Sequence, residues 1–295
     1  MTSRIWIGGG TNSVYQAGNW APAGTPQPGD MLSMYSGTAN MAGGNLAGDT
    51  LYVGTQTSFA ANTPPAVVNL SDGASLTAVA ATTAFTEQSI VFNTSGFDSL
   101  NLTVNNNYYA TMTTTVNIAA YSLLRGTVAI GGHNGDLTIN GAGLSAFDND
   151  GASSVGYNCV AAIDANVLGI GSFTVSGDAG LSFLNVVGPR QTVDLLGLDS
   201  LNIGNPHAFF GQVDVANAAA PFSIGLDGIT NADSYCYTQD MLTLFRNDCP
   251  INVLRLSDAG SFAVAQTPTG VFVGSSSEVP PGAVLLPQHG AAAPA

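Results

Sequence analysis

The sequence contains no lysine, and five arginines are its only strongly basic side chains. Against them stand 17 aspartates and two glutamates, which gives a formal net charge of −14 and a pI near 4.1. Proteins that bind nucleic acid, or that dock electrostatically on anionic lipid, need clustered Lys and Arg. The lack of lysine therefore argues against both partners.

Charge of either sign is scarce, at 8% of residues, where an ordinary domain has about 25%. Surface helices are built largely from Glu, Lys, Arg and Ala, so a helical bundle is disfavoured. Disorder is disfavoured too, because 45% of residues are apolar and the mean hydropathy is +0.24. No apolar run reaches the roughly 18 residues of a membrane helix, so we expect no membrane insertion.

Turn-forming residues are abundant, with 36 Gly and 24 Asn. Between them lie runs of about 4–7 residues rich in Val, Ile, Leu, Phe and Thr, which are typical of short strands. We predict strands at 50–53, 75–79, 89–92, 99–104, 115–118, 127–130, 136–139, 172–175, 181–187, 192–196, 200–203, 212–215, 222–226, 251–256, 262–265 and 271–273. Many short strands at this spacing indicate a solenoid, barrel or sandwich.

Two weak internal repeats narrow that choice. Residues 96–102 (GFDSLNL) recur as 197–203 (GLDSLNI), and a Ser-Asp-Gly-Ala-like turn between strands occurs within 70–76, 175–181 and 256–262. In such a turn Asp can accept backbone amides and Gly can take a positive φ. A repeated strand–corner–strand unit predicts an all-β fold, a parallel β-solenoid, with a β-sandwich or jelly roll as the alternative.

One segment has helical rather than strand spacing. In 238–247, Met241, Leu242 and Phe245 fit one helix face, Thr238 can cap it, and Pro250 follows. We therefore predict a single short inserted helix over 238–247.

The composition also predicts the organisation of the chain. Residues 1–55 are expected to form a cap and the first coils, and 56–274 the solenoid body. The Ser-, Pro- and Ala-rich residues 275–295 are expected to be an extended tail held by a neighbour.

The first residues carry a family resemblance. Trp-Ile-Gly-Gly-Gly at 6–10, Asn-Trp at 19–20 and Pro-Gly-Asp at 28–30 resemble a repeat of bacterial autotransporter passengers and related surface proteins. The resemblance covers about the first 55 residues and implies a right-handed parallel β-helix with an extracellular structural or adhesive role. Trp6 and Trp20 would then cap the open end of the helix.

The chain departs from that family because it shows no signal peptide and no C-terminal membrane barrel. A leaderless, charge-poor β protein fits a bacteriophage virion component (capsid decoration, head fibre or tail protein). Such a protein folds in the host cytosol, assembles as a homo-oligomer, plausibly a trimer, and leaves by lysis. We expect it in a virion or, as the alternative, on a cell surface as an adhesin or matrix protein.

Few residues suggest chemistry. Asp148 and Asp150 open a calcium-like loop that lacks the closing Glu, and we favour a turn closed by Asp and Asn, so no metal or cofactor is expected. Cys236 and Cys249 flank a short segment, where a disulfide and reduced thiols both remain open. We expect no enzymatic activity, and keep a polysaccharide-degrading β-helix with paired carboxylates as a second alternative.

Two aromatic pairs suggest a binding surface. Tyr108–Tyr109 and Phe209–Phe210 follow Asn-containing segments, at matching places after the two Asp-Ser-Leu-Asn repeats. One interpretation is that these aromatic pairs contact a sugar ring or a protein neighbour. The alternative is that one ring of each pair belongs to the core. We expect association with further copies, a neighbouring structural protein or a surface glycan through these loops, exposed strand edges and the tail.

Overall fold

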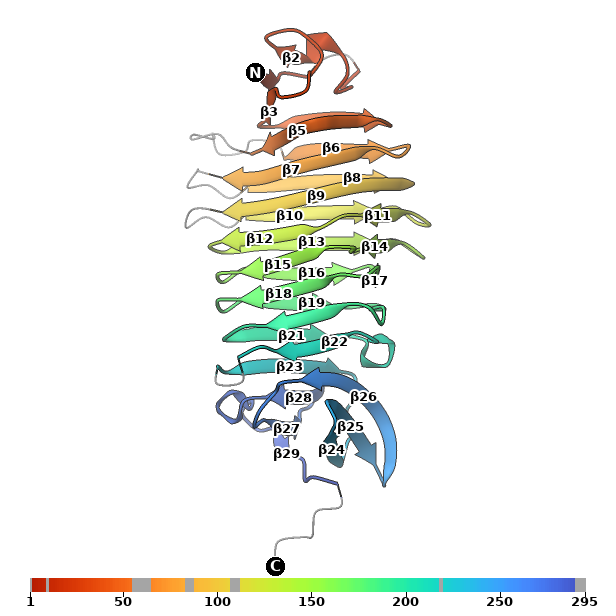
Figure 1. The fold of residues 1–295 in the computed structure, drawn as a ribbon, viewed down its shortest axis with the longest axis vertical. Coiled ribbons are helices and arrows are strands. Elements are labelled where there is room, and N and C mark those ends of the chain that lie inside the picture. Colours follow the sequence, from red (N-terminus) through yellow and green to blue (C-terminus); the bar gives the residue numbers. More distant parts are fainter. Residues whose placement is uncertain are drawn as a thin grey trace, which may run out of the picture.

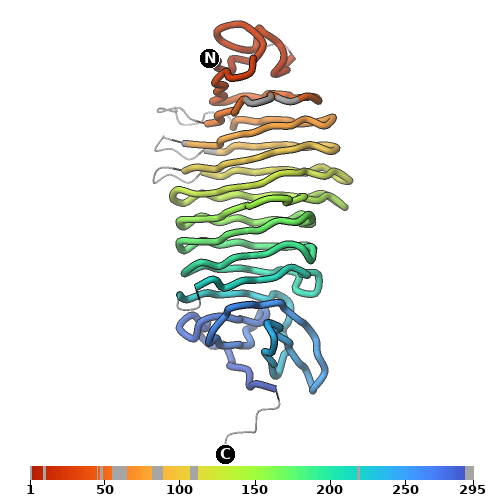
Figure 2. The backbone as a smooth tube through the Cα atoms, in the orientation of Figure 1, coloured from red at the N-terminus to blue at the C-terminus, as the bar shows by residue number. Residues whose placement is uncertain are grey.

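The chain folds into a β-solenoid of about eight turns, with 59% of residues in strands. This computed structural model describes residues 2–8, 11–54, 65–82, 88–106, 112–217 and 220–289. Figure 1 shows the coils stacked along the long axis, and Figure 2 traces the backbone through them. The predicted solenoid is confirmed, and no helix in the described part has the length and apolar character needed to cross a membrane.

Two parallel sheets form the stack, and each coil passes from one to the other. Sheet B is built from β4 (Gly37–Ala42), β6 (Ala66–Ser71), β8 (Gln88–Ser95), β10 (Met112–Ile118), β13 (Gly135–Gly141), β16 (Val160–Asp164), β19 (Gly180–Phe183), β21 (Asp199–Ile203) and β23 (Phe222–Asp227). Sheet A is built from β3 (Met31–Met34), β5 (Asn45–Val53), β7 (Ser75–Thr82), β9 (Phe97–Asn106), β11 (Leu123–Arg125), β12 (Val128–Gly132), β14 (Ala146–Asp148), β15 (Ala152–Gly156), β17 (Asn166–Leu168), β18 (Ser172–Ser176), β20 (Thr192–Leu195) and β22 (Gln212–Val215).

The core lies between the two sheets. Side chains alternate between buried and partly exposed along body strands such as β6 and β10, as a sheet with one covered face requires. The register places one buried side chain above the next from coil to coil, for example Val68, Phe92, Val116 and Ile139. These columns explain why each strand is apolar at every second position.

An asparagine ladder runs along the outer face of sheet B. The side-chain amides of Asn69, Asn93, Asn117 and Asn140 each donate to the side-chain oxygen of the asparagine one coil earlier, at 2.7–3.0 Å, beginning with Asn40. Successive members lie 29, 24, 24 and 23 residues apart, which is the length of one coil. Asparagine suits this position because its uncharged amide is both donor and acceptor for its neighbours.

The repeated GFDSLNL-like motif marks a corner closed by aspartate. Asp98 is 1% exposed; its Oδ1 accepts the amides of Gly73 and Ala74 at 3.2 and 3.0 Å, and its Oδ2 accepts that of Ser95 at 2.9 Å. One buried carboxylate therefore ties its own turn to the preceding coil.

Asp199 makes the same arrangement in the second copy. It accepts the amides of Ala179, Leu196 and Gly197 at 3.2, 3.1 and 2.7 Å. The two motifs lie at opposite corners, however, because Asp98 enters sheet A and Asp199 enters sheet B. The two copies therefore share their corner chemistry and not their place in the coil, and the inference that Tyr108–Tyr109 and Phe209–Phe210 occupy matching places stays untested, because the tyrosines lie outside the described residues.

The N-terminal end of the stack is covered. β1 (Ser3–Trp6) pairs in parallel with β3 and antiparallel with the two-residue β2 (Trp20–Ala21), which follows the short 3-10 turn η1 (Ala17–Asn19). Asn40 of β4 bonds through its backbone to Asn12 and Val14, so this segment covers the first strand of sheet B. Only short edges remain at this end.

The C-terminal end changes from parallel to antiparallel pairing. β26 (Cys249–Ser257) pairs with β22 and continues sheet A into β25 (Met241–Arg246) and β24 (Ser234–Thr238). β28 (Gly270–Gly274) pairs antiparallel with β23 and continues sheet B into β27 (Ala263–Gln266) and β29 (Val284–Leu285). The remaining 3-10 turns are η2 (Pro206–Ala208) and η3 (Ser276–Glu278). Both ends are thus covered, contrary to the exposed strand edges that we expected.

The predicted helix over 238–247 is wrong, because this segment is a hairpin of β24 and β25. Gln239 and Asp240 form its two-residue turn, with φ of +51° and +59°, which matches the twist of an antiparallel pair. Leu242 and Leu244 are buried on alternate positions of β25. The apolar residues of this segment fit both the helical and the strand period, and the turn at Gln239 and Asp240 favours the hairpin.

Candidate functional site

The two tryptophans of the N-terminal motif pack together in the cap. Trp6 and Trp20 are buried, with ring centroids 5.2 Å apart and planes at 77°. The Trp20 indole N–H donates to the carbonyl of Val14 at 2.8 Å. This edge-to-face pair fills the end of the apolar column, which is a structural role.

An ion pair fastens the cap to the first strand of sheet A. Arg4 Nε lies 2.6 Å from Asp30 Oδ2, and both side chains are largely buried. The Arg4 hydrogen bond lowers the pKa of Asp30 to about 2, against the effect of burial and with help from the amides of Thr2 and Gln27. The sequence analysis identified the Pro-Gly-Asp motif but not this partner.

Both carboxylates of the candidate metal site, Asp148 and Asp150, have partners within the chain. Asp148 Oδ2 lies 3.2 Å from Arg125 Nε on the neighbouring coil. Asp150 Oδ1 accepts the amide of Ile170 at 3.1 Å. Across the described residues, no cluster of three or more metal-ligating side chains occurs. These contacts are those of corner-closing aspartates.

Of the two aromatic pairs, the structure describes only Phe209 and Phe210, and the two rings lie in different environments. Phe209 is buried against Phe183, with ring centroids 6.1 Å apart, so its assignment as an interface residue is wrong. It belongs to the core because its backbone forms a parallel bridge with Val187 of the preceding coil. Phe210 is exposed as expected. Tyr108 and Tyr109 lie outside the described residues.

Exposed apolar side chains gather instead at a corner that sequence analysis overlooked. Phe97, Tyr121 and Leu144 are 76%, 80% and 74% exposed, and we call them the corner row. Phe97 opens β9, and the other two sit in the turns before β11 and β14. The pairing of β9, β11 and β14 in adjacent coils brings these corners together, at the right edge of Figure 1. Apolar residues in turns between predicted strands were the available signal.

Tyr121 is also held in an unfavourable backbone conformation. Its φ is +60°, a region that glycine and asparagine occupy readily and bulky side chains rarely do. Conformational strain of this kind is concentrated at functional sites. Tyr157, with a φ of +51° and 65% exposure, shares this combination at another turn.

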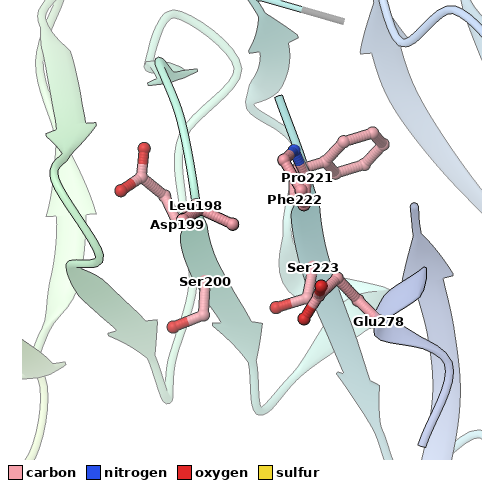
Figure 3. A pocket seen from close by; sticks show the side chains of 7 residues that line it. All are labelled: Leu198, Asp199, Ser200, Pro221, Phe222, Ser223 and Glu278. Carbon is pink, nitrogen blue, oxygen red and sulfur yellow. The ribbon is translucent and has the colours of Figure 1, made fainter. Parts of the chain in front are cut away.

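An open cavity of about 210 Å³ lies at the opposite, sheet-A-to-sheet-B corner. Its lining combines Leu198 and Pro221 with the hydroxyls of Ser200 and Ser223 and the carboxylate of Glu278. Figure 3 shows Glu278 beside Ser223, near the start of β23. A small apolar floor with hydroxyl and carboxylate groups is suited to weak contact with a polar ligand such as a sugar.

Two aspartates face each other between coils on the outer face of sheet A. Asp194 of β20 is in register with Asp214 of β22. Burial, and then the neighbouring Asp214 charge, raise the pKa of Asp194. Gln212 donates to Asp214 Oδ1 at 3.2 Å. A carboxylate pair is what a glycoside hydrolase needs, but neither Asp194 nor Asp214 lines the cavity of Figure 3, whose two carboxylates are those of Asp199 and Glu278.

The cysteines do not form the disulfide considered from sequence. Cys159, Cys236 and Cys249 are all free. Cys236 in β24 lies opposite Thr243 of β25. Cys249 in β26, on the other side of β25, lies opposite Arg246. Two strand spacings and an offset of three residues along the strands place them more than about 10 Å apart, beyond the roughly 7 Å that a disulfide can bridge.

No known relative identifies the chain. No family model, curated protein or solved structure matches it. The function must therefore be argued from the surface of the solenoid itself.

Proposed function

We propose that this chain is a structural component of an extracellular particle, and favour a phage virion protein such as a capsid decoration, head fibre or tail protein. It acts by associating with copies of itself, plausibly as a trimer, and with a neighbouring structural protein. The observation that carries the proposal is the corner row, whose three side chains are the most exposed of the large apolar residues in the described part of this charge-poor solenoid. Exposed apolar side chains at adjacent corners are typical of interaction sites.

The covered ends leave no parallel strand of the body open for pairing. The cap covers the first strands, and antiparallel strands cover the last ones, so the body cannot grow end to end by adding parallel coils. The corner row runs along the side, where two or three solenoids can pack with their long axes parallel. Closed symmetry around such an axis is the commonest outcome for copies of one chain.

The free thiols favour a virion protein over an exported adhesin. Cys249 is exposed and Cys236 half-buried, and both are unpaired. Proteins that mature in oxidising compartments tend to pair such residues, whereas proteins that fold in a reducing cytosol leave them free. A virion protein folds in the cytosol and is released by lysis.

The association proposal is tested by emptying the corner row. The double variant Tyr121→Asn/Leu144→Ser removes two of its side chains while keeping a residue that tolerates positive φ at position 121. Light scattering after size exclusion should show a smaller oligomer for this variant. Ile7→Ser, an exposed apolar residue at the capped end, is the matched control and should leave the oligomer unchanged. Equal masses for wild type and double variant would contradict the proposal.

The location is tested separately by electron microscopy. Antibodies against the chain should label phage particles released from the source cells. Labelling of the cell envelope alone would instead support the second candidate, a surface adhesin or matrix protein. The cavity at Leu198, Ser200 and Glu278 is the observation that favours that candidate. It would be established if the wild-type protein binds glycans on an array and the Glu278→Gln variant does not.

A further inference from the structure

The last described residues join the ends of the two sheets. We call residues 284–289 the C-terminal clasp. Val284 and Leu285 pair with Gln266 and Ala265 of β27, the end of sheet B, and Gln288 forms a bridge with Tyr235 of β24, the end of sheet A. Figure 1 shows β29 beneath β27, with β24 beside it. One six-residue segment therefore covers an edge of both sheets.

The clasp is held mainly through its backbone. The Leu286 amide donates to Val264 at 2.8 Å, and the Tyr235 amide donates to Pro287 at 3.1 Å. At the end of the clasp, the His289 ring stacks on Phe245, with centroids 4.1 Å apart and planes at 9°. Backbone pairing at a strand edge is satisfied equally by the same segment from another chain.

The linker before the clasp is weakly attached to the body. Ser275 is anchored, since its amide donates to Phe222 and its hydroxyl accepts the Phe222 amide at 3.1 Å. Within the described chain, the hydrogen bonds of residues 276–283 are all local, such as those from Glu278 to Ser275 and from Ala283 to Pro280. The linker contains the turn η3 and a second turn at Pro280–Ala283, and Pro280 and Pro281 restrict its backbone. The clasp can thus leave its site without breaking the body.

The clasp carries two apolar side chains that its own chain does not cover. Val284 and Leu285 are 66% and 62% exposed. We propose that the clasp exchanges between two copies, so that residues 284–289 of one chain dock on β27 and β24 of the other. The exchanged contacts equal those lost, which makes exchange a low-cost route to a dimer. The paired linkers then bring Val284 and Leu285 of both copies close together. This inference rests on the proposed self-association and names a surface for it.

Single cysteines test the exchange directly. In a Cys236→Ser/Cys249→Ser background, Ala265→Cys and Leu285→Cys are placed in separate, differently tagged chains. These residues are directly opposite in an antiparallel pair, which is a separation that a disulfide can bridge. After mixing and mild oxidation, we expect a disulfide between the two tagged chains. Ile7→Cys mixed with Ala265→Cys is the collision control, because Ile7 is exposed at the other end of the stack.

A second measurement does not depend on disulfide geometry. Replacing Pro280 and Pro281 by glycine relaxes the linker and favours closure onto the same chain. The dimer dissociation constant from light scattering should then rise about two- to fivefold.

Two results would overturn the exchange. They are cross-linking no greater than in the collision control, and dissociation constants that are equal with and without the prolines. If the corner-row variant abolishes the oligomer and the tagged chains never cross-link, the exchange is overturned and the proposed function stands. Cross-linking that persists when the corner-row variant has no effect supports exchange and contradicts the corner row.

Discussion

Asp98 offers the sharpest test of how the coils are held in register. Replacing it by alanine removes the acceptor of three backbone amides, those of Gly73, Ala74 and Ser95, at a buried corner. A hydrogen bond contributes about 1 kcal/mol to stability, and more when one partner is charged. Asp98→Ala should therefore lower the free energy of unfolding by about 3 kcal/mol. Asp199→Ala should give a similar loss, because its carboxylate also accepts three amides.

Equilibrium urea unfolding measures the loss, and hydrogen exchange locates it. A solenoid is stabilised by contacts between neighbouring coils, so the effect should be local. The amides of Gly73, Ala74 and Ser95 should lose protection, while those of distant coils keep it. Asp136→Ala is the control, since Asp136 lies half-buried on the outer face of β13 and should change stability by less than about 0.5 kcal/mol. A loss below about 1 kcal/mol for Asp98→Ala, or an equal loss in the control, would refute the reasoning.

Three further predictions concern the cap and the two outer faces. Because the pKa of Asp30 is lowered from 3.8 to about 2, its contribution is complete above pH 3.8 and lost as the pH falls towards 2. The fluorescence of Trp6 and Trp20 should report this loosening of the cap, and a transition that survives in Asp30→Asn would contradict the assignment. The pKa of Asp194 is raised, so its charge destabilises the fold increasingly as the pH rises through that pKa. Asp194→Asn should raise stability at pH 7 by about 0.5 kcal/mol and leave it unchanged near pH 3, and equal effects at both pH values would sink this account. Asn93→Ala removes two side-chain hydrogen bonds of the ladder and should lower the free energy of unfolding, measured in urea, by about 1–2 kcal/mol. Asn40→Ala breaks one, so a loss as large as that of Asn93→Ala would argue against the ladder.

Sequence patterns predicted the solenoid because its signal is local. In a strand with one buried face, apolar and polar residues alternate, and a corner needs Asp, Asn or Gly. A residue type therefore indicates its place, as Val68 does in a strand and Asp72 at a corner. The hairpin at Gln239 was missed because Met241, Leu242 and Phe245 fit a helix face equally well. The corner row was missed because it depends on register between coils. Tyr121 and Leu144 lie in different coils, and no single segment indicates that they meet.

The shortage of charge follows from the same register. Parallel coils place each outward side chain about 4.8 Å from its counterpart in the next coil, so a charged position tends to face a like charge. Asp194 and Asp214 show the consequence, since the second charge raises the pKa of the first. An asparagine at such a position bonds to its neighbour instead, as Asn69 and Asn93 do. Aspartate is retained at corners, where backbone amides rather than other aspartates surround it. The absence of lysine is therefore consistent with a stacked fold.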